Sequence, residues 1–259
     1  MEKPLEFADL LRLMDERSTA FQAAVAAASS LDVRVPTCPE WTLFDLVQHL
    51  VEGRHKWAAI VAAGPADAPA AVSAPVAPRE REAVLAWFAA SVRELLDALR
   101  EAGPDRGCWT WWGTSQSPQT SGAVARHQLQ QLAVHTYDAQ VAVGAPQPLS
   151  GEVALDGVDE FLTTCVATAA PWPHKPAVVD YHATEGHSWR LWLSADGARA
   201  ARLPRGAAAG EGPEAADVAA WGTANELVMF FYGRITMESL RIEGDRGIFD
   251  QLIAWDPEL

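Results

Sequence analysis

The sequence has few cysteines, a deficit of positive charge and no long apolar run. Cys38, Cys108 and Cys165 are odd in number, far apart and outside any C-x-x-C pair, so we expect a reducing, cytoplasmic location and no disulfide framework. Lys and Arg total 20 against 34 Asp and Glu, a formal net charge of −14, which argues against a nucleic-acid partner. No apolar stretch is long enough to cross a membrane, and the N-terminus lacks the apolar core of a signal peptide.

The first part of the chain is patterned as helices. Apolar residues recur at helical spacing in four segments, which are residues 5–29, 43–63, 79–102 and 126–143. Thr42 and Asp45 have the spacing of a capping box at the start of the second segment. The Pro- and Ala-rich residues 64–78 are expected to cross one end of a helical bundle.

The pattern changes near residue 150. Residues 151–168 are expected to form a helix, and short alternating segments typical of strands follow it, with helices at 225–234 and 246–255. Residues 206–215 are expected to be a flexible stretch. The predicted fold class is therefore α+β, with a four-helix bundle at residues 1–147 and a small α+β domain at 148–259.

The fourth helical segment carries a polar row. His127, Gln131 and His135 follow one another at four-residue intervals, and Asp138 lies near the same stripe. Such a row is consistent with a solvated surface or with the wall of a wet cavity. If the second and fourth helices face each other, His49 joins Gln131 and His135 as a mononuclear metal site with open positions. The neutral amide of Gln131 is a poor zinc ligand compared with a carboxylate.

Three other features keep two interpretations each. His127 lies on the same row as His135 and could replace Gln131 as a ligand. The tryptophans of residues 108–122 either plug the end of the bundle or line a ligand pocket. Cys38 has no identifiable base near it in sequence, which favours a structural role over a nucleophilic one.

Several motifs resemble those of one family. Residues 35–50, VPTCPEWTLFDLVQHL, look like the N-terminal signature of the mycothiol-dependent maleylpyruvate isomerase family, in the DinB-like superfamily. Residues 131–139 resemble its second signature, with Gln131 in place of a glutamate and Tyr137 in place of a tryptophan. Residues 224–245 resemble its C-terminal domain, so the likeness covers both halves of the chain.

The resemblance implies a DinB-like bundle that holds a divalent metal, usually zinc, through His49, Gln131 and His135, with a mycothiol-type thiol as cosubstrate. Zinc would lower the pKa of the thiol and favour a thiolate nucleophile. Arg234 would bind a substrate carboxylate through two parallel hydrogen bonds from its guanidinium, or else interact favourably with the dipole at the C-terminus of a helix. Asp138 would orient His135, or else form a plain salt bridge.

Two functions follow from this resemblance. The first is a metal-assisted, thiol-dependent isomerase or S-transferase that acts on a small electrophile. The second is a metal-poor family member, either a small-molecule binding protein or a metal-free enzyme that uses the same cavity. A small-molecule substrate and a monomer or homodimer are expected in both cases, without nucleic acid or membrane.

Overall fold

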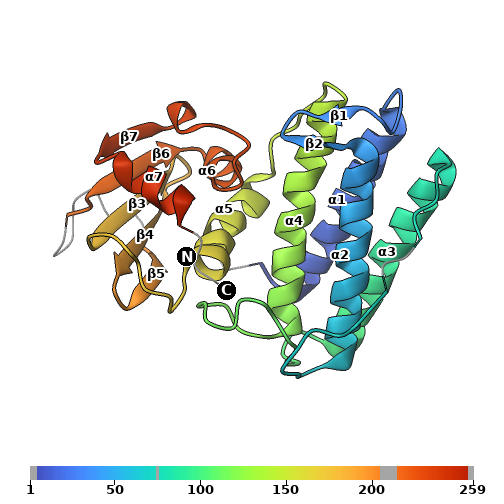
Figure 1. Cartoon of the computed structure of the whole chain (residues 1–259), viewed down its shortest axis with the longest axis horizontal. Helices are drawn as coiled ribbons and strands as arrows, with labels where there is room; N and C mark the ends of the chain where they lie inside the picture. The colour runs from blue at the N-terminus through green and yellow to red at the C-terminus, as the bar shows by residue number, and fades with distance from the viewer. Residues whose placement is uncertain (1–4, 74–75, 205–214, 256–259) are drawn as a thin grey trace. The chain divides into compact units, whose positions relative to one another are not determined.

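The computed structural model describes residues 5–73, 76–204 and 215–255, and the chain divides into two compact units (Figure 1). Unit 1 comprises Met1–Thr110 and Gln119–Leu149, and unit 2 comprises Trp111–Pro118 and Ser150–Leu259. Helices fill the first unit and a sheet with helices forms the second, so the predicted α+β fold is confirmed. The expected flexible stretch at 206–215 lies almost wholly outside the described residues.

Unit 1 is built on four long helices, close to the four segments that the apolar spacing predicts. These are α1 (Phe7–Ala27), α2 (Leu43–Ala63), α3 (Arg81–Ala102) and α4 (Ser121–Ala142). Helix α1 packs chiefly on α4, and α2 packs chiefly on α3. No helix among the described residues is both long and apolar enough to cross a membrane.

Helices α2 and α3 run in the same direction. The Arg81 side chain at the start of α3 donates to the carbonyl of Ala28, just beyond α1, so α3 begins at the end of the bundle where α2 also begins. At the other end, Arg106, which follows α3, donates to the carbonyl of Ala62 in the last turn of α2. The connection between α2 and α3 therefore runs the length of the bundle, and the expectation that it crosses one end is wrong.

A short hairpin precedes α2. Strands β1 (Arg34–Val35) and β2 (Cys38–Thr42) pair antiparallel, where the prolines predicted only a loop. The predicted capping box is present, since the Thr42 backbone N–H donates to the Asp45 carboxylate at 2.8 Å and the Asp45 N–H donates to the Thr42 hydroxyl at 3.2 Å. The cap fixes the direction in which α2 leaves the hairpin.

Unit 2 contains a five-stranded sheet in the order β5-β4-β3-β6-β7, in which only the β3–β6 pair is parallel. The strands are β3 (Ala177–Ala183), β4 (His187–Ser194), β5 (Gly197–Arg202), β6 (Val218–Gly222) and β7 (Arg241–Gly244). The helices are α5 (Gly151–Glu160), α6 (Ala224–Phe231) and α7 (Gly247–Ala254), with a 3-10 turn, η2 (Met237–Ser239). The expected helix at 151–168 is α-helical only as far as Glu160, and a π-helical segment, η1 (Phe161–Val166), continues it.

The two faces of the sheet differ in chemistry. On one face Tyr181 packs against Phe231 of α6 and Phe249 of α7. On the other face Asp180 and Arg190 form a buried bidentate ion pair with both N–O distances at 2.7 Å.

Part of the tryptophan-rich segment, Trp111–Pro118, also belongs to this unit. Gln116 exchanges two hydrogen bonds with the Ala200 backbone, and Trp112 is fully buried. The burial of Trp112 favours its packing role.

A buried arginine lies in the core of unit 1. Arg54 is 3% exposed, and its guanidinium carbon lies 4.4 Å from the ring centre of Phe88, which stacks on Phe21. Burial lowers the pKa of Arg54 to about 9. Within the part of the chain that is described, Nη1 of this guanidinium has no hydrogen-bond partner. The ring face offsets part of the desolvation of the charge, but no carboxylate does.

Replacing Arg54 by an apolar residue of similar length is therefore expected to stabilise the protein. We expect Arg54→Met to raise the free energy of unfolding by about 1–2 kcal/mol, because the variant no longer desolvates a charge. Urea unfolding followed by circular dichroism measures this, and the exposed Arg100→Met serves as control, with a change within about 0.5 kcal/mol. A loss of stability in Arg54→Met would show that the guanidinium is fully hydrogen-bonded in solution.

Candidate functional site

Two predicted ligands, His49 of α2 and His135 of α4, lie together in unit 1. Their rings meet edge to face with centroids 5.1 Å apart. Trp41 of β2 lies beside both, at 4.7 Å from His49 and 6.0 Å from His135. The hairpin thus supplies an aromatic wall that the sequence reasoning missed, although Trp41 lies inside the first signature.

Asp138 fixes the orientation of His135. Its carboxylate is fully buried and accepts a hydrogen bond from His135 Nδ1 at 2.9 Å. The Thr37 hydroxyl donates to its other oxygen at 2.6 Å, and the Cys38 thiol donates weakly at 3.8 Å. When a carboxylate accepts a hydrogen bond from Nδ1–H, the proton of the neutral ring stays on Nδ1, and Nε2 is free to bind a metal through its lone pair. Metal-bound histidines commonly have this arrangement.

His49 is kept neutral. Desolvation beside its aromatic neighbours, followed by the charge of His135, lowers the pKa of His49 to about 4, although the residue as a whole is exposed to solvent. A metal ligand must be the neutral imidazole, so this environment removes the competition with protons at neutral pH.

Gln131 lies one helical turn before His135 and is half-buried. Its side chain makes no hydrogen bond to any other residue that the structure describes. The predicted donor set is two imidazoles and one neutral amide oxygen. The imidazoles fit zinc or a similar divalent ion, whereas the amide is a weak third ligand.

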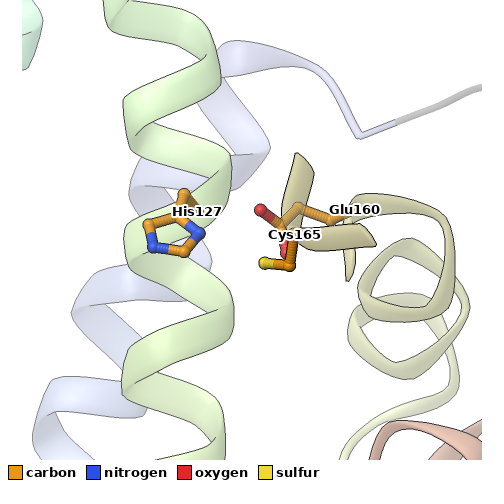
Figure 2. A group of neighbouring side chains, drawn as sticks. All are labelled: His127, Glu160 and Cys165. Atoms are coloured by element: carbon orange, nitrogen blue, oxygen red, sulfur yellow. The ribbon is translucent and has the colours of Figure 1, made fainter. Parts of the chain in front are cut away.

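His127 lies on α4 (Figure 2). It precedes His135 by eight residues, which corresponds to about 12 Å along a helix. It is buried, and its ring lies 6.4 Å from that of Trp57. This distance along the helix does not favour His127 as a substitute for Gln131 at the His49–His135 site.

Unit 2 holds a further pair of donors that the sequence analysis did not select. Glu160, at the end of α5, and Cys165, in η1, have ligand atoms within 4.8 Å of each other (Figure 2). Burial, and then the charge of Glu160, raises the pKa of the Cys165 thiol well above its ordinary value. Cys165 is therefore a protonated and weakly nucleophilic thiol at neutral pH.

Arg234 follows α6 in unit 2 and is half-buried, with Nη1 donating to the carbonyl of Tyr232. Burial raises the pKa of the Tyr232 hydroxyl well above its ordinary value; Glu160 and Cys165 add to the rise, and Arg234 opposes it. Arg234 and Glu160 thus act on the Tyr232 hydroxyl with opposite charges.

The lowered pKa of His49 gives a pH dependence of known sign. Because the unfolded chain takes up this proton near pH 6.5 and the folded chain only near pH 4, stability should rise with pH across that window. NMR titration of the metal-free protein should find His49 still neutral at pH 5. The pH slope of urea unfolding should be smaller in His49→Gln than in the wild type, and an equal slope would contradict the assignment.

Two crystal structures resemble this chain, those of mycothiol-dependent maleylpyruvate isomerase and of a histidine-to-alanine mutant of it. Each alignment covers 92% of this chain and 93% of the other, with a TM-score of 0.62 and identities of 14% and 13%. At such identity the likeness establishes the fold. No curated protein matches the sequence.

Family models give the closer relationship. The mycothiol maleylpyruvate isomerase N-terminal domain matches residues 11–140, and the MDMPI C-terminal domain matches residues 152–251. The first match alone spans half of the 259 residues, and the two together account for most of both units. The chain therefore belongs to the mycothiol-dependent maleylpyruvate isomerase family.

Proposed function

We propose that this protein is a mycothiol-dependent isomerase of a small electrophile, assisted by a divalent ion, with zinc the first candidate. The observation that carries the proposal is the convergence of His49 and His135, with Asp138 orienting the latter. Family membership supplies the thiol, and these side chains supply a place for an ion. Arg234 is proposed to hold a substrate carboxylate.

When bound, the ion would supply the positive charge that keeps the cosubstrate thiol deprotonated at neutral pH. The side chains prepare for this in separate ways. His49 stays neutral and so presents a lone pair. Asp138 holds the His135 ring in one orientation and one tautomer. Trp41 lies beside both rings and offers them an apolar neighbour on one side.

The proposed reaction is the isomerisation of a carbon–carbon double bond. The thiolate adds to one carbon of the double bond, and the electron pair moves onto the conjugated carbonyl. Rotation about the resulting single bond follows, and expulsion of the same thiolate restores the double bond, so no atom is gained or lost. If the α-carbon of the adduct takes up a proton from water instead, the carbon–sulfur bond is retained and the reaction is S-transfer, which is the finer alternative within this site.

Gln131 favours a second candidate function. With a neutral amide where the family has a carboxylate, the protein could hold little metal and act as a small-molecule binding protein or a metal-free enzyme in the same cavity. Its half-buried amide offers both a donor and an acceptor to a bound molecule, which a carboxylate would not.

The first test is thiol-dependent turnover. Zinc-loaded protein should isomerise maleylpyruvate with mycothiol and not without a thiol, and His49→Ala or His135→Ala should reduce the rate at least about 100-fold by removing an imidazole ligand. Asp138→Asn should weaken zinc binding by about 10- to 100-fold while leaving the fold intact. Turnover that is equal with and without a thiol, or equal in the metal-free protein, would overturn the proposal.

The second test concerns Gln131. We expect Gln131→Glu to tighten zinc binding at least about 10-fold, since a carboxylate adds a full negative charge beside a dication. Gln140→Glu is the matched control: it makes the same change nine residues further along α4, where the side chain accepts from the Gln147 N–H, and should alter zinc affinity less than about 2-fold.

The assay of both variants with mycothiol separates the two functions. If Gln131 marks a weakened metal site, Gln131→Glu gains turnover together with zinc. If Gln131 binds the substrate through its amide, turnover falls while zinc content rises. Zinc affinity that is the same in Gln131→Glu and the wild type would remove position 131 from the ligand set.

A further inference from the structure

Unit 2 contains a cavity of about 560 Å³ whose lining residues all belong to that unit. Aromatic side chains dominate its wall, namely Phe161, Tyr181, Phe230, Phe231, Phe249 and Trp255. A water molecule occupies about 30 Å³, and well-packed interiors hold few voids larger than one water, so this space is not a packing defect. Its size lies within the range of small-molecule sites, about 300–1,000 Å³.

The aromatic wall is held in place by its own contacts. Phe161 of η1 stacks on Phe231 of α6, with ring centroids 4.9 Å apart and planes 13° from parallel. Tyr181 of β3 meets Phe231 edge to face at 5.0 Å, and Phe249 of α7 meets Phe230 in the same way at 5.8 Å. Contacts among η1, α6, α7 and β3 thus hold the rings in place before a ligand binds, which reduces the conformational entropy lost on binding.

The π-helical turn is part of this wall. The segment η1 contributes Phe161, Leu162, Cys165 and Val166 to the lining. A π-helical turn widens a helix by one residue per turn and is found frequently at functional sites. The Cys165 thiol stays protonated, so this part of the wall is uncharged and the thiol reacts only slowly with electrophiles.

The charged groups along the cavity are acidic. Glu238 and Asp250 are both exposed members of the lining, and none of its described residues is a lysine or arginine. Arg246 reaches Glu238 at 3.4 Å, but both side chains are more than half exposed, so the pair screens the rim only weakly. A ligand with a carboxylate would meet like charge here, whereas an amine would meet opposite charge.

We propose that this cavity binds a small aromatic molecule whose polar end is neutral or cationic. The site is independent of the proposed isomerase function, because it uses neither metal nor thiol and none of the residues assigned to catalysis. Arg234 lies between two lining residues, Gly233 and Ile235, but is not itself in the lining, and its guanidinium donates to the Tyr232 carbonyl.

Displacement of the neutral dye Nile red tests the site in the full-length protein. We expect saturable binding of one dye per chain. 1-Naphthylmethylamine should displace the dye at a concentration at least about 10-fold lower than 1-naphthoate, which has the same rings and the opposite charge. Absence of saturable binding, or equal displacement by the two naphthalenes, would overturn the proposal.

A filling variant locates the binding. Leu252→Trp places a larger side chain in the lining, whereas Ile242→Trp makes a similar change at a half-buried position of β7 outside the cavity. Dye affinity should fall at least about 10-fold in the first and stay within about 2-fold in the second, with folding checked by thermal unfolding. Equal affinities in the two variants would place the dye elsewhere.

Alkylation of Cys165 gives a test in the unaltered chain, which holds even if Leu252→Trp does not fold. Saturating 1-naphthylmethylamine should slow the reaction of N-ethylmaleimide with Cys165 at least about 5-fold, as measured by peptide mass spectrometry. Cys38, which is half-buried in unit 1, is the internal standard and should react at an unchanged rate. Unchanged labelling of Cys165 would contradict binding in the cavity.

Discussion

The buried carboxylate of Asp138 joins the parts of unit 1 that build the candidate site. It accepts from His135 on its own helix and from Thr37, which lies 101 residues earlier in the chain. Full burial makes the loss of any of these bonds costly, since an unsatisfied buried charge is penalised by several kcal/mol. The hairpin that carries Thr37 also carries Trp41, and α2 follows it directly. The position of His49 and the orientation of His135 therefore depend on the same carboxylate.

Local patterns predicted most of the fold. Apolar spacing predicted the four bundle helices, and the Thr42–Asp45 pair predicted the start of α2, because both signals act within a few residues. Helix α4 starts at Ser121 instead of Arg126, since Thr120 caps it within a segment whose tryptophans and small polar residues predicted a loop. The β1–β2 hairpin was missed because Pro36 and Pro39 exclude a helix without indicating a strand, and a pairing this short leaves little pattern. The π-helical turn at Phe161–Val166 has no periodic signal of its own.

The site was predictable in part. The i, i+4 row on α4 pointed to Gln131 and His135, and the resemblance of residues 35–50 to a family signature added His49 from another helix. Thr37 and Trp41 lie within that signature, but nothing local says that their side chains turn toward α4. The same limit applies to Glu160 and Cys165. Five residues apart, they would not share a face of a regular α-helix, and only the wider π turn brings them together.

Because α2 and α3 are parallel, the length of the connection between them decides whether this arrangement can form. Helix α2 has 21 residues and is about 30 Å long. A chain that returns over this length needs at least about nine extended residues. Residues 64–80 exceed this minimum, so the connection tolerates changes of composition and modest changes of length without altering the bundle. Below the minimum, α3 could only follow α2 as an antiparallel hairpin, and a different face of α3 would then meet Arg54.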